Sequence, residues 1–239
     1  GAEATVTFCS RSTQLSGSSV NSAAVKFVYY GRRVAADLLE ANVEEVVLDR
    51  STGTFHVVGS PSVSRTWTEG AATGQELAAE SNETMPCTYP FGTHVAVVEI
   101  DTDTGGVRLD RIVTCDDAGT IINPVIVEGQ RHGGIAQGVA QALLEEVVYD
   151  ADGTPQTTNF ADYSIISMAE LPSFDLVPLE TATPNNPLGV KGIGESGAVG
   201  STPAVANAVI DGLSHLGIRH LDVPLSPQRV WEAIRSPVQ

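Results

Sequence analysis

Residues 189–200 have the sequence GVKGIGESGAVG, in which five of the twelve positions are glycine. The six residues 192–197, GIGESG, satisfy the pattern G-x-G-x-x-G that marks a dinucleotide-binding turn in doubly wound α/β folds. Such a turn needs a buried strand directly before it. The preceding residues, TATPNNPLGVK, carry two prolines and two asparagines where that strand would run, so a nucleotide-binding fold is disfavoured.

The rest of the pattern alternates hairpins with helices, which predicts an α+β fold of mixed helices and β-hairpins. Alternating apolar residues around turns predict hairpins in residues 43–59 and 93–119. Helical spacing predicts helices at 18–42, 66–80, 123–147 and 201–217, the last capped by Ser201 or Thr202, and a strand followed by a short helix at 218–235. Residues 154–188 are expected to be irregular. The chain, 1–239, is long enough for one domain or for two subdomains, about 1–120 and 121–239.

Composition limits the classes of partner. The chain has 29 acidic and 13 basic residues, and its net charge of −16 disfavours nucleic acid and anionic membrane surfaces. No apolar run approaches the ~20 residues of a membrane span. Its three cysteines, Cys9, Cys87 and Cys115, form no C-x-x-C pair, which disfavours an iron–sulfur or zinc site in this chain and favours a reducing, cytoplasmic compartment.

The predicted helix beginning at Asn123-Pro124 contains Gly129, Gly133, Gly134 and Gly138 in its first half. Each glycine costs roughly 0.5–1 kcal/mol of helix stability relative to alanine. Another group is therefore expected to approach this helix closely, either a ligand or a neighbouring helix or sheet. Gln130 lies among these glycines, and its amide suits an oxygen-rich ligand.

Three segments together resemble one known family. The segments TFCSRSTQLSG (7–17), EGQRHGGIAQGVAQALLEE (128–146) and NPLGVKGIGESGAVGSTPAVANAVIDGL (186–213) occur in the order and form typical of the molybdenum hydroxylases. This family includes the xanthine dehydrogenases, aldehyde oxidases and carbon monoxide dehydrogenases. The resemblance runs from about Gly1 to Arg235 and is to the carboxy-terminal part of the molybdopterin-binding subunit, whose fold it therefore implies.

The resemblance implies roles for particular residues. Glu195 resembles the glutamate that acts as general base beside the metal, and Gln130 resembles the glutamine whose amide meets a molybdenum oxo ligand or the pterin. For a base of this kind we also expect apolar neighbours to desolvate the Glu195 carboxylate. The other residues with implied cofactor contacts are Phe8, Cys9, Ser10, Arg11, Ser12, Lys191, Gly192 and Gly194. No protein ligand to the metal is expected, because the pterin dithiolene holds it.

The resemblance also implies an activity and its partners. We expect a molybdenum-dependent oxidoreductase that inserts water-derived oxygen into an aldehyde or an N-heteroaromatic carbon. The expected cofactor is molybdopterin cytosine dinucleotide with oxo and sulfido ligands, and the expected partners are the rest of the molybdenum subunit, a 2Fe-2S subunit and an FAD subunit. The alternatives are a carbon monoxide dehydrogenase-like subunit and a non-catalytic structural half of such a complex.

Overall fold

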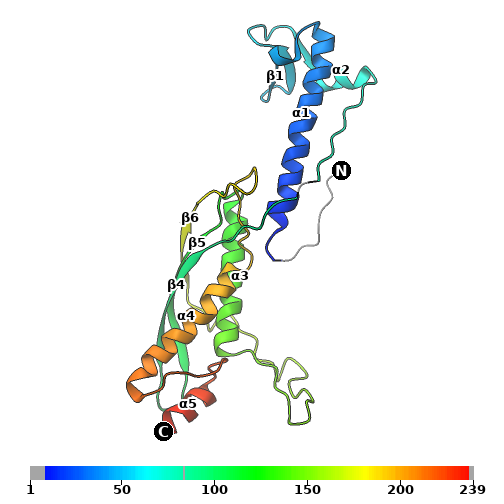
Figure 1. Cartoon of the computed structure of the whole chain (residues 1–239). Helices are drawn as coiled ribbons and strands as arrows, with labels where there is room; N and C mark the ends of the chain where they lie inside the picture. The colour runs from blue at the N-terminus through cyan, green and yellow to red at the C-terminus, as the bar shows by residue number, and fades with distance from the viewer. Residues whose placement is uncertain (1–8, 83, 237–239) are drawn as a thin grey trace. The chain divides into compact units, whose positions relative to one another are not determined.

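The computed structural model describes residues 9–82 and 84–236, which fall into two compact units (Figure 1). The first unit contains residues 12–86 and 185–188, and the second contains residues 9–11, 87–184 and 189–236. We expected a boundary near residue 120, whereas the chain leaves the first unit near residue 86. The physical reason is that the second hairpin forms one sheet and one hydrophobic core with the helices that follow it.

The first unit packs one long helix on a small antiparallel sheet. Trp67 organises its core, because its ring stacks on Phe27 with centroids 4.8 Å apart and meets the edge of Phe55 at 4.6 Å. Gly31 on the long helix leaves room for the Trp67 ring, since a Cβ there would lie 2.4 Å from it. The elements are η1 (Thr13–Gly17), α1 (Ser18–Leu39), η2 (Val43–Glu45), β1 (Val46–Asp49), β2 (Thr54–Val57), β3 (Ser64–Thr66) and α2 (Trp67–Ala72).

The second unit places helices on a three-stranded sheet of order β4-β5-β6. Strands β4 (Gly92–Ile100) and β5 (Val107–Asp117) form the predicted hairpin, and β6 (Phe174–Leu179) pairs parallel to β5. The helices are α3 (Pro124–Leu143), α4 (Ser196–Leu213), η3 (Ser214–Leu216) and α5 (Pro227–Arg235). The core joins the sheet to these helices through fully buried side chains such as Ile112, Ile135, Val139, Val205, Val209 and Leu213.

Helices α3 and α4 touch backbone to backbone, and the glycines make this possible (Figure 1). A Cβ on Gly134 would lie 3.1 Å from the Cα of Gly197 on α4, and a Cβ on Gly138 would lie 2.0 Å from Ser201 Oγ. In contrast, a Cβ on Gly129 or Gly133 would meet no heavy atom within 4 Å. The glycines of α3 therefore form two sets, of which one serves helix packing and the other leaves bare backbone at the surface.

Three sequence-based predictions of secondary structure were wrong. Residues 154–188 contain β6, which the prolines obscured, because Pro178 is tolerated on an edge strand. Helix α4 begins at Ser196 rather than at a Ser201 or Thr202 cap, and Ser201 Oγ instead donates to the Gly197 carbonyl at 2.6 Å. No strand forms in the described residues 218–226.

The two sets of glycines predict opposite effects of the same substitution. Gly138→Ala should lower the free energy of unfolding by about 1–3 kcal/mol, because the new methyl group displaces the buried Ser201 hydroxyl and forces α3 and α4 apart. Gly133→Ala should raise it by roughly 0.5–1 kcal/mol, because the methyl group meets open space and alanine favours the helix. Urea unfolding of both variants checks this, and equal effects would contradict the assignment of Gly138 to helix packing.

Candidate functional site

The loop before α4 is held at its start by the end of β5. Lys191 N donates to the Ala118 carbonyl at 2.9 Å, and Thr120 N donates to the Gly189 carbonyl at 2.9 Å. Gly119, with φ +64, allows this approach, because a Cβ there would lie 2.4 Å from the Gly189 carbonyl oxygen. The loop thus runs from the end of the central strand β5 to the first turn of α4.

Glu195 lies at the N-cap of α4, and its side chain does not cap the helix. Its carboxylate is exposed and accepts a hydrogen bond from Ser10, with Ser10 Oγ 2.9 Å from Glu195 Oε2. We expected Glu195 to be desolvated between apolar neighbours. The structure corrects this, because the flanking Gly194 has no side chain and Ser196 is small, so nothing in the described residues of the second unit covers the carboxylate.

Two glycines bring Ser10 and Gln130 up to this carboxylate. A Cβ on Gly192 would lie 1.9 Å from the Ser10 carbonyl oxygen, so only glycine allows the loop this close to residue 10. A Cβ on Gly194 would lie 3.1 Å from both Ser10 Oγ and Gln130 Oε1. The structure therefore gathers five of the predicted site residues around one point.

The surface beside Gln130 is unusually open. Gln130 itself is exposed on the first half of α3, and Gly129 and Gly133 beside it present backbone with no side chain. A ligand can therefore reach the Gln130 amide and the α3 backbone next to Glu195. The open glycines and Gln130 form a surface that suits a large polar ligand.

Lys191 has its charge satisfied within the protein. Its Nζ lies 3.2 Å from Asp117 Oδ2, the side chains are 10% and 0% exposed, and the ammonium sits 4.9 Å from the centre of the Phe91 ring. Burial would raise the pKa of the Asp117 carboxyl, but hydrogen bonds from Thr181 and Gly119, together with Lys191, outweigh it and lower the pKa. Lys191 therefore anchors the glycine loop to β5.

The remaining predicted residues belong to the loop before α1. Cys9 is exposed with a free thiol, and both Cys9 and Ser10 adopt left-handed backbone, with φ of 52 and 53. Arg11 is half-buried in the second unit, and Ser12 begins the helical segment of the first unit. Phe8 lies outside the described residues.

A buried polar network behind the site was missed from the sequence. Arg131 Nε lies 3.0 Å from Asp116 Oδ2, and His94 Nε2 lies 2.8 Å from Asp116 Oδ1. Burial would raise the pKa of Asp116, but His94 and Arg131 outweigh this and lower it. The sequence carried one signal of this network. Arg131 lies one helical turn before Ile135, so both side chains lie on the same, buried face of the helix. A buried cation requires a buried partner of opposite charge.

Arg131 also ties α3 to the sheet. Its Nη2 donates to the Thr114 carbonyl at 2.9 Å and to the Val177 carbonyl at 3.1 Å. Arg131, the residue next to Gln130, is thus hydrogen-bonded to both β5 and β6. These hydrogen bonds fix the first half of α3 on the sheet. The network therefore positions Gln130 without contacting it.

Within the described residues, no group of three or more histidine, cysteine or acidic side chains could hold a metal ion. The same residues contain no helix long and apolar enough to cross a bilayer.

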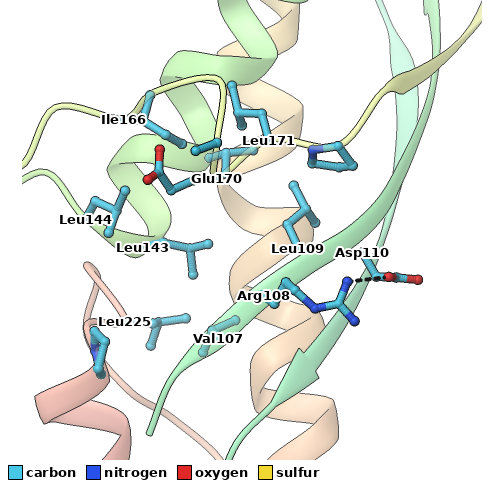
Figure 2. Close-up of a pocket in the computed structure, with 14 residues that line it drawn as sticks. Val107, Arg108, Leu109, Asp110, Leu143, Leu144, Ile166, Glu170, Leu171 and Leu225 are labelled. Carbon is cyan, nitrogen blue, oxygen red and sulfur yellow. Dashed lines mark hydrogen bonds and ion pairs between the residues drawn. The ribbon is translucent and has the colours of Figure 1, made fainter.

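A cavity of about 430 Å³ lies elsewhere in the second unit (Figure 2). Figure 2 shows mainly aliphatic side chains such as Leu109, Leu143 and Leu225 around it, and its Arg108 pairs with Asp110 at 2.8 Å. Leu143 follows Gln130 by 13 residues on α3, which is about 20 Å along the helix axis. The cavity is thus separate from Glu195. The carboxylate of its remaining charged lining residue, Glu170, accepts a hydrogen bond from Ser167 Oγ at 2.6 Å.

Comparisons with known proteins agree on one family. The molybdopterin cofactor-binding domain family matches residues 2–172. The carbon monoxide dehydrogenase large chain of Hydrogenophaga pseudoflava is 36% identical in an alignment 240 positions long, which covers 96% of this chain and 30% of that protein. The nicotine 6-hydroxylase large subunit of Paenarthrobacter nicotinovorans is 34% identical in an alignment 249 positions long, which covers 98% of this chain and 30% of that protein.

The fold agrees with a solved structure of the same group. Quinoline 2-oxidoreductase from Pseudomonas putida 86 superposes with a TM-score of 0.83 at 35% identity, over 96% of this chain and 30% of that one. The predicted α+β fold of mixed helices and hairpins is confirmed by this match. The chain spans about 30% of the length of the curated relatives it matches.

The Lys191–Asp117 pair generates a prediction for stability. Lys191→Met should lower the free energy of unfolding by about 3 kcal/mol at pH 7, because it leaves a buried carboxylate without its cation. The folded pKa of Asp117 lies below its ordinary value of 3.8, so the penalty is full above pH 3.8 and disappears as the pH falls through the folded pKa. Urea unfolding at several pH values measures it. The exposed Lys26→Met is the control, and a pH-independent penalty would contradict the ion-pair explanation.

Proposed function

The chain belongs to the molybdenum hydroxylase family through its molybdopterin cofactor-binding domain, and on this basis we propose that it carries the general base of such an enzyme. The observation that carries the proposal is that Gln130 Oε1 lies beside Gly194, the residue before Glu195, while Ser10 contacts both Gly194 and the Glu195 carboxylate. The proposed activity is insertion of water-derived oxygen into an N-heteroaromatic or aldehyde carbon.

The surface around Glu195 fits a large polar cofactor such as molybdopterin. Gly129 and Gly133 leave a face without side chains where a Cβ would meet open space, and Gln130 offers its amide from the same face. The loop of residues 9–11 supplies further backbone and hydroxyl groups beside Glu195. Within this chain we assign cofactor contacts to Cys9, Ser10, Arg11, Gln130, Gly192 and Gly194, and to Phe8 and Ser12 by resemblance. Lys191 contributes by fixing the loop.

When bound, the molybdenum cofactor supplies the Lewis acid that activates water and the two-electron acceptor. Glu195 would act there as the proton acceptor, and Oε1 would be the accepting atom, because the Ser10 hydroxyl donates to Oε2. Ser10 keeps Oε2 occupied as an acceptor. Gly192 and Gly194, on either side of Ile193, allow Ser10 and Gln130 to approach the loop beside Glu195.

The cofactor form and the partners are further parts of the proposal. We assign the cytosine dinucleotide form of molybdopterin, which bacterial members of the family typically carry. For the electrons that leave the molybdenum centre we propose a 2Fe-2S subunit and an FAD subunit as acceptors in a cytoplasmic complex. Related proteins are named as large chains or large subunits, which supports such an assembly.

The names of the relatives point to two substrate classes. Nicotine 6-hydroxylase and quinoline 2-oxidoreductase are both named for an N-heteroaromatic substrate, which supports hydroxylation of such a ring. The carbon monoxide dehydrogenase large chain is related at a similar identity and supports the second candidate, oxidation of carbon monoxide. Turnover assays with an N-heteroaromatic compound and with carbon monoxide separate the two.

The assigned base predicts the effect of one substitution. Glu195→Gln should lower kcat by several orders of magnitude while leaving the fold and the molybdenum content intact, because an amide cannot accept the proton. Steady-state kinetics of the purified holoenzyme measures this, and Glu232→Gln, an exposed change on α5, is the control. Turnover near the parent value at full molybdenum content would refute the mechanism. It would also favour a non-catalytic structural role for the chain.

The exposure of the site predicts that residues 1–239 do not bind the cofactor alone. Both Glu195 and Gln130 are exposed, whereas a cofactor of this size needs a deep, largely closed cleft. The rest of the molybdenum subunit is therefore expected to close the other side. Size-exclusion chromatography with metal analysis of the separately expressed chain checks this. A monomer that holds stoichiometric molybdenum and oxidises substrate with an artificial acceptor would overturn the prediction.

A further inference from the structure

We propose that Ser10 is a positioning residue for the general base, which holds the Glu195 carboxylate in one orientation. This role differs from the cofactor contact assigned to Ser10 by resemblance, and it rests on the proposed function of Glu195. The central observation is the hydrogen bond from Ser10 Oγ to Glu195 Oε2 at 2.9 Å, between residues 185 positions apart in the chain.

Glu195 has no other described support for its side chain. Its backbone begins α4, but the carboxylate makes no capping bond and is exposed. An exposed glutamate with three rotatable bonds samples several rotamers unless a partner selects one of them. The Ser10 hydroxyl is the donor that makes this selection within the described residues.

The backbone at Ser10 is costly, which indicates that its side chain matters. Its φ of 53 lies in the left-handed region that non-glycine residues seldom adopt. A glycine would adopt the same backbone without strain, so folding alone favours glycine at residue 10. The serine keeps the strained backbone and adds only the hydroxyl that reaches Glu195.

The neighbouring glycines are placed so that the hydroxyl can reach the carboxylate. A Cβ on Gly192 would lie 1.9 Å from the Ser10 carbonyl oxygen, and a Cβ on Gly194 would lie 3.1 Å from Ser10 Oγ. Any side chain at residue 192 would push the Ser10 loop away from α4. The two glycines thus allow the hydrogen bond to form.

The test compares Ser10→Gly with the parent in the assembled holoenzyme. We expect kcat to fall about tenfold, which is the loss of one modest hydrogen bond to a charged group, while KM changes less than about twofold. Molybdenum content should stay at the parent level. The thermal unfolding midpoint should stay equal or rise, because the left-handed strain is gone. Ser10→Ala, which keeps the strain and loses the hydroxyl, should show the same fall in kcat.

A matched control separates strain from catalysis. Glu40 at the end of α1 has φ 51 and is exposed in the first unit, so Glu40→Gly relieves the same kind of strain. It should raise the unfolding midpoint as Ser10→Gly does and leave kcat unchanged. A purely structural role for Ser10 would make activity and stability change in the same direction.

Further outcomes decide between Ser10 acting through Glu195 and acting on the cofactor. In a Glu195→Gln background, Ser10→Gly should cause no additional loss of kcat. An unchanged kcat in Ser10→Gly alone, or a loss of molybdenum, would overturn the proposal while leaving the assignment of Glu195 intact. If Glu195→Gln retains turnover, the proposed function fails instead. A crystal structure of Ser10→Gly then decides the positioning role, since several Glu195 rotamers support it and one unchanged rotamer overturns it.

Discussion

The backbone contact between α3 and α4 is the constraint on which the site depends. Gly134 and Gly138 on α3 meet Gly197 and Ser201 on α4 at distances that no larger residue on α3 would allow without displacement. Gln130 lies one helical turn before Gly134, and Glu195 lies two residues before Gly197. Because the two contacts set how the helices approach each other, they also bring the amide and the carboxylate to the same place.

A second constraint fixes that helix pair on the sheet. Arg131 joins Asp116 and the carbonyls of Thr114 and Val177, so α3 is bonded to both β5 and β6 from within the core. The ring of His94 completes the network from β4, and a Cβ on Gly200 of α4 would lie 2.5 Å from it. A buried charged network of this kind contributes less to net stability than to one fixed arrangement, because every misplacement leaves a charge unpaired. Here the arrangement that it fixes is the one that positions Gln130.

The sequence predicted those elements whose signals are local. The capping residue Asn123 with Pro124 marked the start of α3, and alternating apolar residues marked the β4–β5 hairpin, because cap chemistry and strand alternation are properties of neighbouring residues. The start of α4 and the strand β6 were missed, because Gly197, Gly200 and Pro178 disfavour regular structure locally and are accepted only through long-range packing. The gathering of Ser10, Gln130 and Glu195 was available only through the resemblance. No local pattern specifies a contact between residues 185 positions apart.

The position of Glu195, the proposed base, is fixed by contacts at the two ends of a seven-residue segment. At one end, Lys191 binds Asp117 and the Ala118 carbonyl, which fixes the loop to β5. At the other end, Gly197 packs directly against the backbone of α3, which fixes the end of the loop relative to that helix. The Cα of Glu195 is therefore determined by the sheet and the helix pair together, and the fold leaves only the side-chain rotamer undetermined. That last freedom is small in energy but decisive for proton transfer, since a base must lie within hydrogen-bond reach of the proton that it accepts. In the proposed role, the Ser10 hydroxyl removes this rotational freedom of the Glu195 side chain. One hydrogen bond is enough, because the backbone already fixes the rest of the position of Glu195.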